Sequence, residues 1–161
     1  MKTDIVERLY AEYYNDALIY TLSLTKSKSL AEEIAQGAFF KALKTADDSI
    51  KNFKPWLLTV CRNSFLSMQR KMKKQVALSD DLQLADAEEA LIDKVIRDEE
   101  YQALYKAISL LSEVQREIIT LFYFENVPIK TIGEIIGKNE NNVKVLLYRA
   151  RENLKQILEE R

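Results

Sequence analysis

Glycine and proline are so scarce in this chain that few tight turns can be built. The 161 residues include 3 glycines and 2 prolines, whereas average usage is about 7% and 5%. An all-β sandwich or barrel needs a turn roughly every 8–12 residues, so most such folds are excluded. With 47% hydrophobic and 30% charged residues, the composition is that of a globular protein and not of a disordered chain. The sequence therefore predicts an all-α fold.

Several kinds of site are excluded by the residues that the chain lacks. It has no histidine, and Cys61 is its single cysteine. Histidine-dependent catalysis, an internal disulfide and a multi-cysteine metal centre are therefore ruled out. Without a general base, a metal cluster or a glycine-rich phosphate loop, we expect no enzyme, no cofactor and no metal. The uncharged run Ala17–Thr25 is too short for a membrane span or a signal peptide, so we expect a cytoplasmic protein without membrane insertion.

The net charge of −1 hides a strong asymmetry along the chain. Residues 1–75 carry a net charge of +5, residues 76–100 carry −7, and residues 101–161 carry +1. We therefore predict two small helical domains, 1–75 and 101–161, joined by an acidic linker, 76–100. Because an acidic segment is repelled by DNA, the linker must face solvent, a basic partner or a basic channel.

Three helices are predicted in the first domain from apolar residues that recur every three or four positions. The first stripe is Ile5, Leu9, Tyr13, Ala17, Tyr20 and Leu24. The second is Leu30, Ile34, Ala38 and Ala42, and Ser29–Glu32 reads as the capping box that begins its helix. Residues 45–52 are a polar break, and Pro55 suits the first turn of the third helix. That helix carries Leu57, Val60, Cys61, Ser64 and Met68 on one face.

The second domain shows the same kind of periodicity, with clearer start and stop signals. A helical period runs from residue 101 to residue 111, and Ser112–Gln115 forms a second capping box. Residues 126–128 break the following helix, after which a short helix is predicted from Pro128 to Ile136. Gly137 suits a left-handed cap, and Asn139 suits the N-cap of a last helix over about 140–159.

The last two predicted helices have the dimensions of a helix-turn-helix motif. Gly133 lies on the face where the two helices should cross, and a side chain there would hold them apart. A buried stripe is predicted for Val143, Leu147, Ala150 and Leu154. The outward residues are Glu140, Asn141, Lys144, Tyr148, Arg151 and Lys155. Spacing alone fits an ordinary helical hairpin with a solvated face equally well.

Two sets of motifs resemble the extracytoplasmic-function (ECF) sigma factors, the small sigma subunits of bacterial RNA polymerase. Leu111–Glu117, Ile132–Gly137 and Asn142–Arg151 are similar to region 4 of that family. Ala31–Ala42 is similar to region 2.2, and Phe53–Leu57, Arg62-Asn63 and Arg70-Lys71 are similar to regions 2.3 and 2.4. The resemblance extends over nearly the whole chain, in order and at the family's spacings.

The resemblance implies a function in transcription initiation. A member of this family binds the core RNA polymerase through its first domain, which also melts the promoter −10 element. Its second domain docks on the polymerase flap and binds the −35 element, and many members are held inactive by an anti-sigma partner. We therefore expect core RNA polymerase, promoter DNA and an anti-sigma factor as partners. The net charge of −7 in the linker suits a positively lined channel.

The resemblance also assigns candidate residues. The −35 contacts are expected from Asn141, Asn142, Lys144, Tyr148, Arg149 and Arg151. The −10 contacts are expected from Lys54, Arg62, Asn63, Arg70 and Lys71. The polymerase contacts are expected from Glu32, Glu33 and Gln36. Asn and Lys near a helix N-terminus can reach base edges, whereas Arg149 and Arg151 lie further along, where phosphates are nearer.

The chain departs from the family pattern at several positions. Gly37 stands where an acidic residue usually follows the region 2.2 glutamine, and Ser67 stands near the place of a usual aspartate. Pro128 replaces a frequent serine and still suits the first helical position. In the recognition helix, Val145-Leu146 replaces a frequent Ser-Arg pair, which removes one usual phosphate contact.

The sequence leaves open the roles of some side chains and the choice between several functions. Trp56 suits either core packing against Phe53 or stacking on an unpaired base, and Tyr148 either packs or touches a phosphate. Cys61 fits inert burial better than redox sensing. The basic run 70–74 can follow a phosphate backbone or form a solvated helix end. Two functional alternatives remain: a stand-alone helix-turn-helix regulator that binds operator DNA, and an interaction module that mainly binds a regulator.

Overall fold

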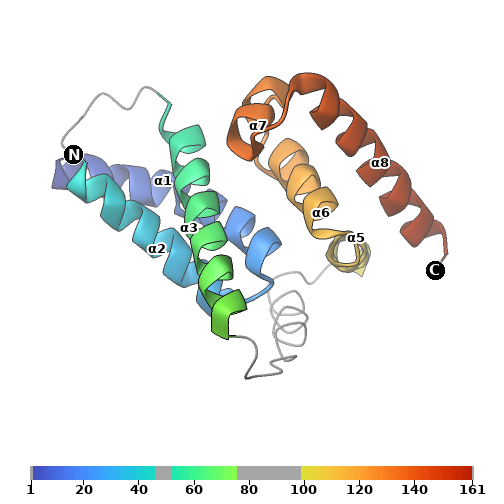
Figure 1. The fold of residues 1–161 in the computed structure, drawn as a ribbon, viewed down its shortest axis with the longest axis horizontal. Coiled ribbons are helices and arrows are strands. Elements are labelled where there is room, and N and C mark those ends of the chain that lie inside the picture. The colour runs from blue at the N-terminus through green and yellow to red at the C-terminus, as the bar shows by residue number, and fades with distance from the viewer. Residues whose placement is uncertain (1, 46–51, 76–98, 161) are drawn as a thin grey trace. The chain divides into compact units, whose positions relative to one another are not determined.

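The computed structural model describes residues 2–45, 52–75 and 99–160, and each regular element in those ranges is a helix (Figure 1). They form two compact units, α1 to α3 and α5 to α8. The prediction of an all-α chain with two helical domains is thereby confirmed. The predicted linker, except for residues 99–100, and residues 46–51 of the predicted polar break lie outside the described residues. The exact domain boundaries at 75 and 101 stay a prediction.

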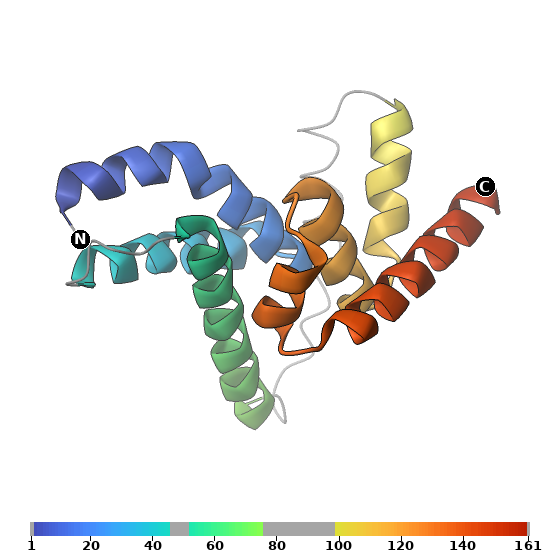
Figure 2. The same ribbon diagram turned by 90° about the horizontal axis from the view of Figure 1, so that it is seen from above.

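The first unit is a three-helix bundle of α1 (Thr3–Thr25), α2 (Lys28–Lys44) and α3 (Phe53–Gln75). Figure 2 shows α1 and α2 side by side, with α3 crossing them. The turn between α1 and α2 is made by Lys26, whose φ of 53° is left-handed, and by Ser27, whose side chain accepts the Leu30 N–H. The capping box predicted at Ser29 is therefore wrong by two residues, because Ser27 already caps the helix there.

Small side chains let α1 and α2 approach closely. Ala17 on α1 and four alanines on α2 are fully buried: Ala31, Ala35, Ala38 and Ala42. The Thr21 hydroxyl donates to the carbonyl of Ala17 in its own helix and also lies within bonding distance of the Ala31 carbonyl, at 3.3 Å. Because alanine loses little side-chain entropy on burial, this seam forms at small entropic cost.

The second unit comprises α5 (Glu99–Ser109), α6 (Glu113–Ile119), the π-helical turn η2 (Thr120–Phe124), α7 (Ile129–Ile136) and α8 (Glu140–Glu159). Helix α8 packs on α5, α6 and α7. The predicted N-caps are confirmed, since Ser112 accepts the Gln115 N–H and Asn139 accepts the Asn142 N–H. Pro128 occupies the N-cap position of α7 and not its first helical position, one residue from the prediction.

The π-helical turn η2 continues α6 and was not predicted. The Glu125 N–H bonds to the Thr120 carbonyl at 3.0 Å, five residues back, so this hydrogen-bonded turn holds one residue more than a turn of α-helix. Asn126 then adopts a φ of 54° and reverses the chain toward α7. The inserted residue changes the direction of the side chains in η2, so that Tyr123 is exposed while Thr120 and Leu121 are buried.

Candidate nucleic-acid interface

A tight turn sets the angle between α7 and α8. Gly137 has a φ of 73°, and the Lys138 N–H bonds to the Gly133 carbonyl at 2.9 Å. The carbonyl oxygen of Lys138 lies directly over Gly133, so a Cβ at Gly133 would overlap it and touch Val143 as well. A side chain at Gly133 was predicted to hold the two helices apart, and the structure places the steric conflict in the turn that joins them, since the contact with Val143 would be an ordinary one. Asn139 then begins α8 by accepting the Asn142 N–H at 2.8 Å.

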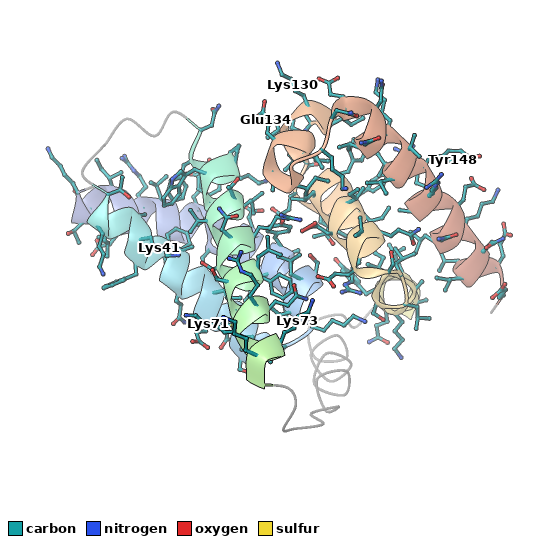
Figure 3. The ribbon with its side chains drawn as sticks, in the orientation of Figure 1. Lys41, Lys71, Lys73, Lys130, Glu134 and Tyr148 are labelled. Atoms are coloured by element: carbon teal, nitrogen blue, oxygen red, sulfur yellow. The ribbon has the colours of Figure 1, made fainter. Side chains whose placement is uncertain are left out.

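Helix α8 has one buried side and one exposed side, as predicted. Val143, Leu147 and Ala150 are buried, but Leu154, which was also predicted to be buried, is only half-buried because it borders an open hollow. The −35 candidates are all exposed: Asn141, Asn142, Lys144, Tyr148, Arg149 and Arg151. The Tyr148 side chain is 63% exposed and lies on the outer side of α8 (Figure 3). Tyr148 therefore does not pack within the unit, and its ring and hydroxyl are accessible to a ligand.

The two arginines that the sequence groups together lie on different sides of α8. At 3.6 residues per turn, Arg149 and Arg151 are separated by about 160° around the helix axis. The Arg151 Nε donates a hydrogen bond to the Tyr123 hydroxyl, and its guanidinium lies 5.5 Å from the ring centroids of Phe122 and Tyr123. Arg151 therefore joins α8 to η2, a contact that Arg149 does not share.

Tyr123, the partner of Arg151, was not among the sequence candidates. It borders a hollow of about 320 Å³ between η2 and the C-terminal half of α8, together with Ile119, Leu154 and Leu158. The run of three aromatic residues from Phe122 to Phe124 was the available signal. The direction of the three rings could not be predicted from a regular helical period, because the π-turn shifts each of them around the axis.

Helix α3 is strongly basic. Residues 53–75 contain no aspartate or glutamate, and their cationic residues are Lys54, Arg62, Arg70, Lys71, Lys73 and Lys74. One of these is used within the unit, since the Lys54 ammonium lies 3.7 Å from an Asp16 carboxylate oxygen on α1. Such an unbalanced helix repels cations and attracts a polyanion.

The −10 candidates are distributed around α3. Asn63 and Arg70, seven residues apart, lie on one exposed line, and Arg70 donates to the Ser67 hydroxyl at 3.2 Å. In Figure 3, Lys71 lies on the side of α3 that faces α2, and Lys73 lies on the other side. Arg62 lies on the Lys73 side, because 11 residues are about three turns. Asn63 and Arg70 thus form the one aligned pair among the candidates, with Arg62 and Lys71 about a quarter turn away on either side and Lys54 roughly opposite.

Lys41 of α2 reaches the same side of α3 as Lys71. Its Nζ donates to the Ser64 hydroxyl at 3.1 Å, although the two residues are 23 positions apart. Its neighbour Lys44 is directed elsewhere, with Nζ 4.5 Å above the ring of Phe40. Sequence reasoning missed Lys41, because nothing in the helical spacing tells which lysine of α2 lies against α3.

Trp56 and Cys61 lie on the buried part of α3. The Trp56 ring is 5.6 Å from that of Phe53 and is half-buried, so core packing is satisfied while part of the ring stays accessible. Cys61 is fully buried, and desolvation raises the pKa of its thiol to about 12, an effect that the nearby Lys41 ammonium opposes. A thiol that stays protonated is a poor nucleophile, which agrees with inert burial.

The polymerase candidates lie on the side of α2 away from the core. Glu33 and Gln36 are exposed, and Glu32 forms an ion pair with Lys28 at 3.9 Å. Burial raises the pKa of the Tyr14 hydroxyl on α1, and a hydrogen bond with Gln36 partly opposes that rise. Phe40 is 56% exposed and continues the line of Glu33 and Gln36.

The described residues also bear on metal binding and on membrane insertion. Within them, no group of three or more Asp, Glu, Cys or His side chains is placed to hold a metal ion. No helix in the same ranges combines the length and the apolar character needed to cross a bilayer.

Comparisons with known proteins follow the same division of the chain. Residues 9–75 match the family described as Sigma-70 region 2, and residues 101–154 match Sigma-70, region 4. The chain is 36% identical over 155 residues to the ECF RNA polymerase sigma factor SigM of Bacillus subtilis (strain 168), with 94% of both proteins covered. It is 26% identical over 161 residues to the RNA polymerase sigma factor YlaC of the same organism, with 95% of this chain and 91% of that protein covered.

A solved structure has the same fold. The sigma factor RpoE of Bartonella quintana, in complex with the anti-sigma factor NepR, superposes with a TM-score of 0.73. The alignment covers 95% of this chain and 96% of that one at 24% sequence identity.

Proposed function

Because this chain belongs to the ECF sigma factors of RNA polymerase, we propose that it binds the core enzyme and directs transcription from a dedicated set of promoters. The observation that carries this function is the presence of both sigma regions in one chain, in order. A stand-alone operator-binding regulator would account for the helix-turn-helix but not for the match to region 2 over residues 9–75. Sigma factors are regulatory proteins and not enzymes.

The −35 element is assigned to the exposed side of α8. A helix-turn-helix inserts the N-terminal part of its second helix into the major groove, while the first helix crosses the phosphate backbone. Asn141, Asn142 and Lys144 lie in the first turns of α8 and carry the donors that base edges accept. Lys130 on α7 is exposed and is placed to contact a phosphate, and it was not among the sequence candidates.

The −10 element is assigned to the exposed side of α3 and its border with α2. Asn63 and Arg70 form the centre of this surface, Arg62 and Lys71 flank it, and Lys41 extends it onto α2 through its bond to Ser64. The accessible part of Trp56 offers a stacking platform at the N-terminal end of the same helix. Lys54 is given a secondary role, because it lies roughly opposite Asn63 on α3 and already pairs with Asp16.

The core polymerase is assigned to α2. Glu33 and Gln36 offer a charge and an amide for directional contacts, and the exposed Phe40 offers apolar area on the same line. Polar groups of this kind set orientation and association rate, whereas the apolar ring contributes affinity.

An anti-sigma factor is the further partner that we propose, since the RpoE structure contains one. Because promoter binding requires access to the chromosome, we place the protein in the cytoplasm. The test of the function is reconstitution: the purified chain is mixed with core RNA polymerase and a library of genomic fragments. Stoichiometric co-elution and promoter-dependent transcripts are expected. Operator binding by the chain without any affinity for core polymerase would instead identify a stand-alone regulator.

A further inference from the structure

Val145 occupies the centre of the exposed side of α8. It follows Val143 by two positions, so it is turned about 160° from that fully buried side chain. Its own side chain is 47% exposed. The residues one turn away on either side, Asn141 and Tyr148 among them, are exposed as well. Val145 is thus the most outward residue of the second turn of the proposed recognition helix.

Local structure gives no reason for a valine at this position. Its exposure shows that it contributes little to the core of the unit. A β-branched residue is also a poorer helix former than the straight-chain residues around it. A polar side chain would satisfy both packing and helix propensity better, which points to a requirement from outside the chain.

We infer that Val145 recognises the C5-methyl group of a thymine in the −35 element. In the major groove, thymine alone presents a methyl group, and apolar side chains contact it. The neighbouring Asn141, Lys144 and Arg149 end in polar groups, so the apolar part of this surface comes from the ring of Tyr148 and from Val145, which is its aliphatic member. The inference rests on the proposed function, because it needs α8 to lie in the major groove of promoter DNA.

Uracil substitution tests the inference directly, since uracil differs from thymine only by the missing methyl. Holoenzyme is used to select a promoter from a library randomised at −35, and each thymine of the selected element, on both strands, is replaced singly by uracil. One replacement is expected to weaken binding by wild-type holoenzyme about fourfold, the effect of one buried methyl group. The same replacement should have no effect on binding by the Val145→Ala or Val145→Ser holoenzymes.

Val114→Ser is the matched control. Val114 is 43% exposed on α6 of the same unit, so this variant loses the same groups from a surface outside the recognition helix. It should keep the full fourfold response to uracil. Val145→Ala also guards against misfolding, because alanine is the better helix former.

Several results would overturn the inference while leaving the proposed function intact. They are a selected −35 element without thymine, a wild-type holoenzyme indifferent to uracil, or a uracil effect that persists in Val145→Ala. Weaker core binding by the Val145 variants with an unchanged uracil effect would reassign Val145 to the polymerase. If wild-type protein forms no holoenzyme or selects no promoter at all, the proposed function itself has failed.

Discussion

The carbonyl oxygen of Lys138 lies against the Cα of Gly133, in the space that a side chain at Gly133 would fill. The Lys138 N–H bonds back to the Gly133 carbonyl, so the turn is closed from both directions. This contact holds α7 and α8 at the angle that presents α8 outward. The geometry of the proposed recognition helix therefore depends on the absence of one Cβ atom.

Gly133→Ala is expected to destabilise the second unit by about 1–3 kcal/mol, because the turn must open to admit the methyl group. Binding to the −35 element should weaken with it. Gly37→Ala is the control, since nothing lies within 4 Å of a Cβ at that position of α2. It should stabilise the protein by about 0.5–1 kcal/mol. Urea unfolding of both variants measures the effects, and equal stabilities for the two would contradict the steric account.

Because Arg151 donates a hydrogen bond to Tyr123, variants of the two residues can distinguish a role in packing from a role in phosphate binding. Tyr123→Phe removes the hydroxyl, so we expect a loss of about 0.5–1.5 kcal/mol in stability and no change in the salt dependence of promoter binding. Arg149→Ala should lower the salt slope by about one and leave stability unchanged. Arg151→Ala should lower both the stability and the salt slope if Arg151 contacts a phosphate, as the sequence predicts. A salt slope unaffected by Arg151→Ala would restrict that residue to joining α8 and η2.

Burial of Cys61 makes the stability of the first unit sensitive to high pH. Its pKa is raised from 9.0 to about 12, so the thiol ionises in the unfolded chain before it ionises in the folded one. Between these two values the unfolded state binds fewer protons, and stability should fall as pH rises, by about 1.4 kcal/mol per pH unit. Below pH 9 the effect should vanish.

The difference between wild type and Cys61→Ala isolates this titration from those of tyrosine and lysine. Unfolding free energies of the two proteins should converge as pH rises from 9 toward 12. A difference that is constant over this range would show that the thiol is not the titrating group.

Lys41→Gln should weaken binding to the −10 element. With a promoter whose −10 region is already single-stranded, the salt slope of holoenzyme binding is expected to fall by about 0.7, the value for one phosphate contact to a single strand. Lys44→Gln removes the same charge from the same helix, but at a side chain directed onto Phe40. It should leave the slope unchanged. Identical slopes for the two variants would remove Lys41 from the DNA surface.

Glu33→Lys combined with Gln36→Ala should weaken core polymerase binding roughly tenfold, which corresponds to about 1.4 kcal/mol. The control is Glu7→Lys combined with Asn15→Ala, which makes the same exchanges at exposed positions of α1. Titration of each protein into labelled core enzyme gives the dissociation constants. If the α1 variant binds core polymerase more weakly than the α2 variant, the assignment of the polymerase surface to α2 is wrong.

The sequence by itself determined the helices and most of their ends. Apolar spacing follows the 3.6-residue period, and caps such as Ser112 and Asn139 act on amides only three residues away. The helix-turn-helix was predictable for the same reason, because Gly133, Gly137 and Asn139 act within a few residues. The cap at Ser27 was missed because several serines compete in that turn and local rules do not rank them.

Tertiary structure decided which side chains meet. Lys41 joins Ser64 across 23 residues, and Arg151 joins Tyr123 across 28. Such pairs depend on the crossing of helices and on the π-turn in η2, and neither has a signature in the spacing of apolar residues. The sequence therefore identified a basic α3 and a polar α8, but only the packed helices showed that Arg151 meets η2 and that Lys41 lies against α3. The reason is physical: composition sets the charge of a helix, and packing sets the direction in which each charge points.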